Sequence, residues 1–306
     1  MNLAKTLFVA TKSRYELMLE KCSGRDAARA NCQSDLVWAD WEEGHHNQKA
    51  NLRKVSQQID SELIVDRSQL TEETIRKHNF FVLLGGDNHF TYCAHEILEY
   101  QRRNLTDLKQ VIGCVLDSRK SLGVLLDYNV DSLLGSRRKL EEDKYRVEHW
   151  TTLEATISGE RTSCQPYPAL CEYVFGENCF FLMSRNKALI DGKEIVPEKG
   201  SGLLVVTGSG SGRGSWYDNI YGCYFDKEDA FGRSEDMAKI VTLVNRDKVI
   251  ATLRKGQVLE VHSSNDDNGI GSTDSHKERV FNFAMGYKAE VRISDYKLHV
   301  IRPKLN

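Results

Sequence analysis

Two uninterrupted apolar segments constrain the fold more than any other feature of this sequence. They are Phe80-Phe81-Val82-Leu83-Leu84 and Val111-Ile112-Gly113-Cys114-Val115-Leu116. A strand that is buried on both faces of a parallel sheet has this continuous apolar character, whereas a half-exposed strand alternates. Helix-favouring segments such as 92–102 lie between the predicted strands, while residues 23–50 are too polar to assign. The alternation predicts a doubly wound α/β domain over residues 1–146.

Each of these apolar runs is followed by a short polar sequence that contains an acid. The first leads into Gly85-Gly86-Asp87-Asn88, and the second leads into Asp117. Ligands of such sheets bind at the carboxyl ends of the strands, so both sequences are candidate ligand contacts. Neither a Walker sequence nor a G-x-G-x-x-G sequence is present, which disfavours P-loop NTPases and Rossmann dehydrogenases.

The Gly-Gly-Asp sequence has a chemical interpretation. Glycines permit positive φ and close approach of a ligand, and Asn88 tolerates the left-handed region. The free amides of a following helix attract phosphate. An acid at that point, Asp87, would hold a metal, hold a hydroxyl group or accept its proton. Taken alone, the sequence favours an ordinary strand-to-helix turn over a ligand site.

The second half of the chain has a different pattern. Alternating segments from about residue 147 onward predict a mainly β domain over residues 147–306, and Asp191-Gly192 between two of them predicts a hairpin. A second glycine-rich turn, Thr207 to Ser211, follows the apolar run 203–206. Its hydroxyl groups and amides suit a ribose or a phosphate. A flexible linker is the alternative, but the apolar sequence before the turn favours a structured site.

Composition excludes several classes of protein. With 42 Lys and Arg against 44 Asp and Glu, the net charge is -2, which is not typical of a nucleic-acid-binding protein. The 8 cysteines show no metal-ligand spacing, and free thiols in a reducing compartment are favoured over a disulfide framework. No apolar segment approaches the ~18 residues of a membrane span, and no signal sequence is recognised. We expect a cytoplasmic protein without nucleic-acid or membrane partners.

Several motifs occur in an order that resembles one known family. They are Thr11-Lys12-Ser13-Arg14-Tyr15-Glu16, Leu83-Leu84-Gly85-Gly86-Asp87-Asn88, the segment from Ile112 to Gly123, the segment from Ala169 to Glu177, Lys199-Gly200-Ser201-Gly202-Leu203 with Thr207-Gly208-Ser209-Gly210-Ser211, and Ser272-Thr273-Asp274. They resemble the motifs of NAD kinases in the ATP-NAD kinase superfamily, and most of all those of the mitochondrial-type branch.

The resemblance implies a fold and an activity. It implies a Rossmann-like α/β domain followed by a β-rich domain that builds a homodimer or higher homo-oligomer. The implied reaction moves the γ-phosphoryl group of ATP, with Mg²⁺, to the 2′-hydroxyl of the adenosine ribose of NAD, giving NADP. Mitochondrial members exist in the branch, but no presequence is seen here.

The resemblance also implies site residues. Asp87 would accept the hydroxyl proton, and Glu172 would bind a ribose hydroxyl. The implied substrate and nucleotide contacts are Gly85, Gly86, Asn88, His89, Asp117, Ser118, Arg119, Cys171, Glu172, Thr207, Gly208, Ser209, Gly210 and Ser211. No metal ligand is assigned.

The chain departs from the family pattern at several positions. Asn88 replaces a glycine and would keep the turn at some strain, and His89 replaces a threonine. His89 is either a phosphate contact or an exposed helix-start residue, and Arg213 is either a phosphate ligand or a solvated loop residue. Val115, Leu116 and Cys171 replace polar residues that contact nucleotide in the family. A related kinase with another acceptor, or a noncatalytic nucleotide-binding regulatory protein, therefore remains an alternative.

Overall fold

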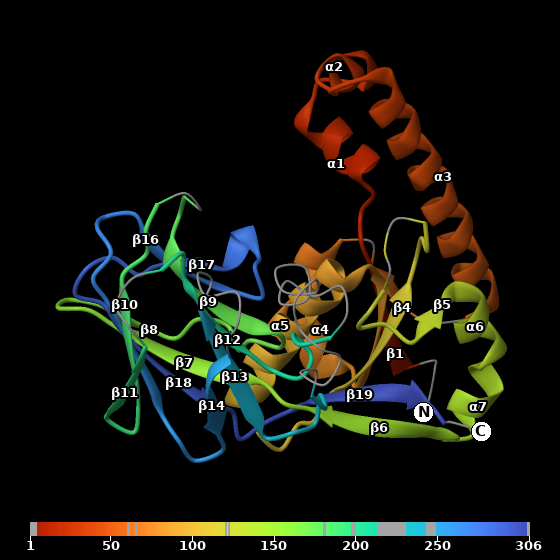
Figure 1. The fold of residues 1–306 in the computed structure, drawn as a ribbon. Helices are drawn as coiled ribbons and strands as arrows, with labels where there is room; N and C mark the ends of the chain where they lie inside the picture. The colour runs from red at the N-terminus through yellow and green to blue at the C-terminus, as the bar shows by residue number, and fades with distance from the viewer. Residues whose placement is uncertain are drawn as a thin grey trace. The chain divides into compact units, whose positions relative to one another are not determined.

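The chain forms two compact units in the computed structural model (Figure 1). The residues described are 5–59, 62–64, 66–119, 121, 123–179, 182–196, 200–212, 231–242 and 249–304. Unit 1 comprises residues 1–93, 108–147 and 300–306, and unit 2 comprises residues 94–107 and 148–299. A single boundary after residue 146 is therefore too simple, because one helix continues into unit 2 and the last strand returns to unit 1.

Unit 1 is built on a mostly parallel sheet. Its helices and strands are β1 (Thr6–Ala10), α1 (Arg14–Lys21), α2 (Arg25–Ala30), α3 (Asp35–Gln58), β2 (Glu62–Ile64), a 3₁₀ turn (Arg67–Gln69), α4 (Glu72–Lys77), β3 (Phe80–Gly85), α5 (Asp87–Arg103), β4 (Gln110–Val115), β5 (Tyr128–Asn129), α6 (Val130–Gly135), α7 (Arg137–Glu141), β6 (Tyr145–Trp150) and β19 (Leu298–Pro303). The strand order is β2-β1-β3-β4-β19-β6, with β5 paired to β4. The pairs β1–β2, β1–β3, β3–β4 and β4–β5 are parallel.

The apolar runs form the centre of this sheet, as predicted. In β3 and β4, all residues but the first are buried, because helices and loops cover both faces of the sheet. The predicted threonine cap is also present, since the Thr71 hydroxyl accepts a hydrogen bond from the Thr74 amide at the start of α4.

The polar segment 23–50 contains helices that its composition did not indicate. Helix α3 is 24 residues long and buries only four of them, so most of its length is polar. The α1 helix packs on α3 through its Tyr15 ring, which contacts the rings of Trp38 and His45. Packing against α1, rather than a strong apolar stripe, accounts for this part of α3.

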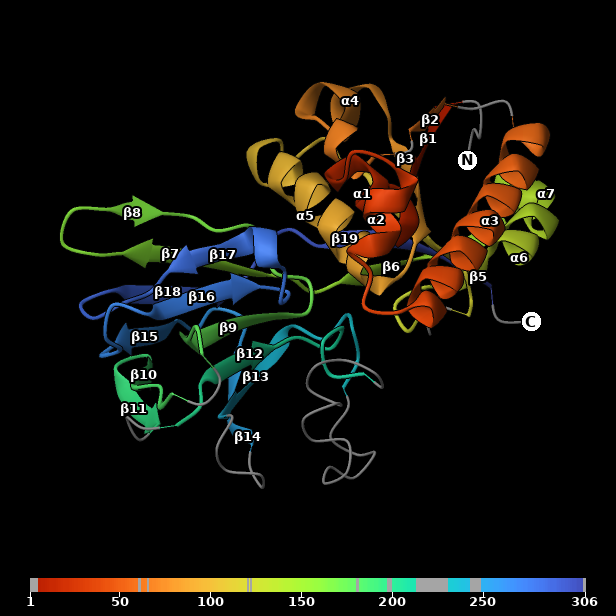
Figure 2. The same cartoon turned by 90° about the horizontal axis from the view of Figure 1, so that it is seen from above.

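Unit 2 is a β-sandwich. Its strands are β7 (Leu153–Ser158), β8 (Ser163–Cys164), β9 (Glu172–Glu177), β10 (Asn186–Ile190), β11 (Lys193–Val196), β12 (Leu203–Val206), β13 (Met237–Thr242), β14 (Val249–Arg254), β15 (Leu259–Ser263), β16 (Gly269–Thr273), β17 (Val280–Asn282) and β18 (Lys288–Ile293), with a 3₁₀ turn at Lys277–Arg279. One sheet has the order β11-β10-β15-β18-β7-β8 and the other β14-β13-β12-β9-β16-β17, and their strands can be followed in Figure 2.

The two sheets of unit 2 share one hydrophobic core. Alternate residues of β7, β15 and β18 from the first sheet meet alternate residues of β9, β12 and β13 from the second. The predicted hairpin is confirmed, because β10 and β11 are antiparallel and Asp191 and Gly192 both have positive φ. This sandwich explains the alternating pattern of the second half of the sequence.

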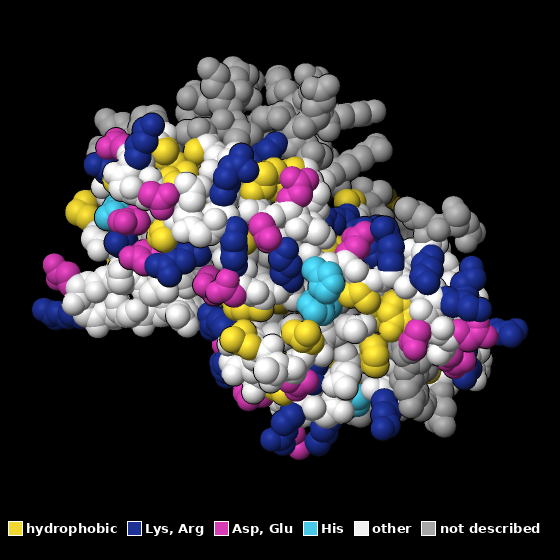
Figure 3. All heavy atoms as spheres, turned by 90° about the horizontal axis from the view of Figure 1, so that it is seen from below, with side chains coloured by type: hydrophobic (Ala, Val, Ile, Leu, Met, Phe, Trp, Pro, Cys, Tyr) yellow, Lys and Arg dark blue, Asp and Glu magenta, His cyan; other side chains and the backbone are white. Residues whose placement is uncertain are grey.

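Three further observations bear on the sequence predictions. The seven cysteines in the described part of the chain are free thiols, and Cys223 lies outside it. None of the described helices combines the length and the apolar character that a membrane crossing requires. On the face seen in Figure 3, Lys and Arg side chains are interspersed with Asp and Glu, in line with the balanced composition.

Candidate active site

The Gly-Gly-Asp loop lies at the carboxyl end of a central strand of unit 1. Strand β3 ends at Gly85, and α5 begins at Asp87. Strand β4 runs parallel to β3 with Val115 opposite Gly85, and the Leu116 amide donates to the Gly85 carbonyl at 3.2 Å. The sequence after each apolar run therefore stands at the same edge of the sheet, as predicted.

Two backbone amides orient the carboxylate of Asp87. The Val124 amide donates to Oδ2 at 3.1 Å, and the Leu125 amide donates to Oδ1 at 2.8 Å. The side chain is half-buried. A carboxylate has about four acceptor positions, so Asp87 keeps the capacity to accept a hydrogen bond from a bound hydroxyl group.

The glycines of the loop are required by close contacts and not by backbone conformation. A Cβ at Gly85 would lie 2.6 Å from the His89 ring, and one at Gly86 would lie 2.8 Å from Ser121 Oγ. Neither glycine has positive φ, and neither has Asn88. The expected left-handed turn is therefore wrong, since Asn88 is an exposed residue in the first turn of α5 and carries no such strain.

His89 is buried, which corrects the expectation of an exposed helix-start residue. Its side chain packs beneath Gly85, and Nε2 lies 3.0 Å from the Val9 carbonyl oxygen. Burial lowers the pKa of His89 to about 4, so the ring is neutral at physiological pH. A neutral ring buried inside unit 1 packs against the loop and is not available as a cationic phosphate contact.

Asp117 and the two residues after it form an irregular turn beyond β4. Asp117 is buried, and its Oδ1 accepts from the Arg119 amide at 3.1 Å. Ser118 and Arg119 are exposed, and the Arg119 guanidinium also pairs with Glu43. Asp117 therefore shapes the turn, whereas Ser118 and Arg119 are accessible to a ligand.

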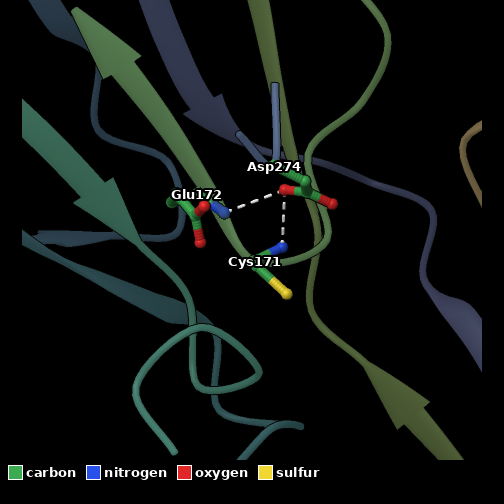
Figure 4. Close-up of side chains that lie close together, drawn as sticks. All are labelled: Cys171, Glu172 and Asp274. Atoms are coloured by element: carbon green, nitrogen blue, oxygen red, sulfur yellow. Dashed lines mark hydrogen bonds between the residues drawn. The ribbon is translucent and has the colours of Figure 1, made fainter. Parts of the chain in front are cut away.

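In unit 2, a single carboxylate organises the bend that leads into β9. Asp274 Oδ1 accepts from the amides of Cys171 at 2.8 Å and Glu172 at 2.9 Å (Figure 4). Its Oδ2 accepts from the Leu170 amide at 3.0 Å and lies 2.8 Å from Nε2 of His95 on α5. The resemblance gave Asp274 only as part of a motif, and here it is the residue that fixes the positions of Cys171 and Glu172.

The backbone around Asp274 is strained. Asp274 and Ser275 both have φ in the left-handed region, at 48° and 55°. Each such residue costs about 1–3 kcal/mol, which the four contacts of the carboxylate offset. The bend places the Ser275 hydroxyl against Glu172, to which it donates at 2.9 Å.

The two buried carboxyl groups have opposite protonation tendencies. Burial, and then the negative charge of Asp274, raise the pKa of Glu172 to about 8. Burial alone would raise the pKa of Asp274 as well, but His95 and the backbone amides outweigh it and lower that pKa. At neutral pH Glu172 is therefore a carboxylic acid that can donate a hydrogen bond, and Asp274 is a carboxylate.

The second glycine-rich turn is buried and packs on the same bend. The Thr207 hydroxyl donates to the Leu170 carbonyl at 2.5 Å and accepts from the Ser209 amide at 3.2 Å. A Cβ at Gly210 would lie 2.4 Å from the Cys171 carbonyl oxygen. Ser209 Oγ is buried without a hydrogen-bond partner among the described residues.

The rest of the turn has the same close-packed character. A Cβ at Gly208 would lie 2.2 Å from the Gly232 carbonyl oxygen, and the Ser211 hydroxyl donates to the Gly208 carbonyl at 3.0 Å. The turn is structured and is not a flexible linker. The predictions on Lys199 and Arg213 fall outside the described residues.

One group of side chains has the composition of a metal site. Ligand atoms of Cys171, Glu172 and Asp274 lie within 4.8 Å of one another, and this is the only such cluster in the described part of the chain. Both oxygens of Asp274 already accept hydrogen bonds, and the Cys171 thiol points away from Asp274 in Figure 4. Mg²⁺ requires near-octahedral oxygen ligands. The cluster therefore does not fit Mg²⁺.

The fold can be compared with solved structures. Yeast NADH kinase complexed with NADH superposes with a TM-score of 0.67 at 13% sequence identity, covering 99% of this chain and 85% of that one. An NAD kinase from Archaeoglobus fulgidus in complex with ATP superposes with a TM-score of 0.60 at 13% identity, covering 96% and 92%. This chain has the fold of the NAD and NADH kinases. No protein-family model and no curated protein sequence matches it.

Within this kinase fold, each unit gathers its own set of predicted residues. Unit 1 brings Gly85, Gly86 and Asp87 to one sheet edge, and unit 2 brings Cys171 and Glu172 against the Thr207–Ser211 turn. The sequence interpretation missed His95 and the amides that hold Asp87. His95 is an isolated histidine on a helix, and backbone amides carry no residue identity, so neither leaves a local signal.

Proposed function

We propose that this chain is an NAD kinase, which transfers the γ-phosphoryl group of ATP to the 2′-hydroxyl of the adenosine ribose of NAD and releases NADP and ADP. The observation that carries the proposal is the position of Asp87. It is the first residue of α5, directly beyond a central parallel strand, and two amides orient its carboxylate. The fold of the NAD and NADH kinases supports the same assignment.

In the proposed reaction, Asp87 accepts the proton of the 2′-hydroxyl. The ribose oxygen then bonds to the γ-phosphorus while the bond from that phosphorus to the β–γ bridging oxygen breaks, and ADP leaves. The first amides of α5 lie next to Asp87 and are suited to bind phosphate oxygens. Mg²⁺ would enter with ATP as part of the substrate, because the triphosphate supplies oxygen ligands of the kind that this ion prefers.

The bend in unit 2 is proposed to recognise the acceptor. Glu172, uncharged at neutral pH, can donate to a ribose hydroxyl and accept from it without adding a negative charge beside a dinucleotide phosphate. The hydroxyl of Ser209 is buried without a partner among the described residues, so a bound nucleotide would satisfy it. Thr207, Gly208 and Gly210 hold the turn in place.

The test is direct assay of the full chain with ATP, MgCl₂ and NAD, with NADP measured by chromatography. NADH is assayed in parallel, since a solved structure with this fold is an NADH kinase. Asp87→Asn removes the proton acceptor and is expected to lower kcat about 10²–10⁴-fold. Asp131→Asn makes the same change at an exposed position of α6 and should leave kcat within about twofold.

One observation favours a second candidate. Cys171 and Leu116 are buried and offer weak or no hydrogen bonding where the family has polar nucleotide contacts. A kinase with another acceptor would form ADP in the presence of a different hydroxyl compound. A noncatalytic binding protein would bind NAD in calorimetry and form no NADP. Full activity of Asp87→Asn would contradict the role given to that residue.

The homo-oligomer and the cytoplasmic location remain predictions of the resemblance and the composition. Light scattering on the purified chain measures the oligomeric state. A monomer at micromolar concentration would contradict the expectation that the β-rich unit assembles.

A further inference from the structure

Unit 1 contains a cavity of about 380 Å³ whose lining includes none of the residues of the proposed active site. Its apolar part is formed by Tyr128 on β5, Leu140 on α7 and Pro303 at the end of β19. Tyr128 and Leu140 are buried, so the surface they offer is fixed. Burial raises the pKa of Tyr128 to about 12, and the phenol is therefore uncharged. The volume lies in the range of small-molecule sites.

The polar part of the cavity is basic. Lys139, Lys144 and Lys304 line it, together with the hydroxyl-bearing Ser136. Lys144 pairs with Glu142 at 2.7 Å. Within the described part of the chain, Lys139 and Lys304 have no carboxylate within ion-pair distance.

This local excess of positive charge contrasts with the chain as a whole, which has a net charge of -2. Some other exposed lysines of unit 1 are paired with a carboxylate, as Lys54 is with Asp131 and Lys77 with Glu73. Two uncompensated lysines beside a fixed apolar surface favour a ligand that is anionic at one end and apolar at the other.

We propose that this cavity binds a small organic anion, whose phosphate or carboxylate group lies beside Lys139 and Lys304 and whose apolar part packs on Tyr128 and Leu140. The Ser136 hydroxyl is available to donate to the same anionic group. The site is separate from the one that handles ATP and NAD, and the proposal does not depend on the kinase activity.

The first test is calorimetric titration of the full chain with phenyl phosphate, which carries both parts of the ligand. Inorganic phosphate carries only the anion, and benzyl alcohol carries only the apolar ring. Phenyl phosphate should bind at a saturable site at least about tenfold more tightly than either partial probe, because each interaction contributes separately. Equal affinity for inorganic phosphate and phenyl phosphate would overturn the proposal.

Paired variants assign the binding to this cavity. The double variant Lys139→Gln with Lys304→Gln should weaken phenyl phosphate binding about 5–30-fold, in the range of two exposed charge contacts. The control double variant Lys21→Gln with Lys77→Gln changes the charge of unit 1 by the same amount without touching the cavity. Equal loss of affinity in both double variants would show that only the general field is involved and would refute the site.

A chemical label provides an independent readout. Pyridoxal phosphate combines a phosphate with an aromatic aldehyde, which condenses with a lysine amine to form an imine and water, and borohydride reduces that imine. Peptide mapping after a short reaction should find the label on Lys139, Lys144 or Lys304, and excess phenyl phosphate should prevent it. Labelling spread evenly over exposed lysines, without protection, would overturn the proposal.

Discussion

The buried carboxyl pair of unit 2 allows one prediction to be worked through in detail. Glu172 keeps its proton in the folded chain up to a pKa of about 8, against an ordinary value of 4.5. Between these values the folded state holds a proton that the unfolded state has released. The free energy of unfolding therefore falls as pH rises through this window, because the unfolded state binds fewer protons. The pKa of Asp274 is lowered, so its titration changes the free energy of unfolding only at pH values below this window.

The replacement Glu172→Gln removes the titration while keeping the shape of the protonated side chain. At 1.36 kcal/mol per unit of pKa, the natural protein loses at most about 4 kcal/mol of its free energy of unfolding between pH 5 and pH 8.5. Entry of water will reduce the measured value, and we expect the variant to gain about 2–4 kcal/mol relative to the natural protein over that range.

Urea unfolding at pH 5.0 and pH 8.5 measures the effect. Glu194→Gln on β11 is the control, since Glu194 is exposed and its one ion pair within the described part of the chain is with Lys187. It should change the free energy of unfolding by less than about 1 kcal/mol at either pH. If the natural protein and Glu172→Gln show the same pH dependence, Glu172 is not protonated by its burial beside Asp274, and the reasoning about this pair is wrong.

Other substitutions test the remaining contacts. Gly210→Ala places a Cβ against the Cys171 carbonyl and should destabilise the protein by about 1–3 kcal/mol in thermal unfolding. Gly212→Ala in the same loop meets no atom of the described residues and should be neutral. His89→Gln should lose less stability than the natural protein between pH 6.5 and pH 4. In the natural protein the unfolded state binds a proton at His89 in this range while the buried ring stays neutral, so the free energy of unfolding falls. Equal midpoints of acid unfolding in the two proteins would contradict this. Asp274→Asn should lower the free energy of unfolding in urea by about 3–5 kcal/mol. A decrease of less than about 1 kcal/mol would show that the carboxylate does not hold the bend in place.

The sequence predicted the parts of the fold that depend on local apolar pattern. The runs at 80–84 and 111–116 became central parallel strands, and the alternating segments of the second half became a β-sandwich. The sequence did not predict the helix over residues 35–50, because α3 is stabilised there by packing on α1. The local sequence of a polar helix does not show which other helix it will contact.

The candidate site was likewise predicted where it depends on local sequence and missed where it depends on contacts between distant residues. Glycines next to an acid after a buried strand located the loop, but the reason for the glycines was wrong, since the constraint is a close side chain and not φ. His89 was misplaced because burial depends on the turn being pressed against Val9, which is 80 positions away. Asp274 was recognised only as part of a motif, because its partners lie more than 100 positions before it.

Strand β19 has a consequence for how the protein is made. It contains residues 298–303, and residues 300–306 belong to unit 1, so the part of unit 1 that leaves the ribosome first lacks a strand of its sheet until these residues have been synthesised. Residues 148–299 emerge earlier and form most of unit 2. Domains usually fold in the order of their synthesis. Here most of unit 2 is synthesised before β19, so unit 2 can fold before the sheet of unit 1 is complete. A chain truncated before β19 would therefore leave the sheet of unit 1 incomplete, and nascent chains that lack β19 would expose the part of the β4 edge that β5 does not pair to other strands or to chaperones.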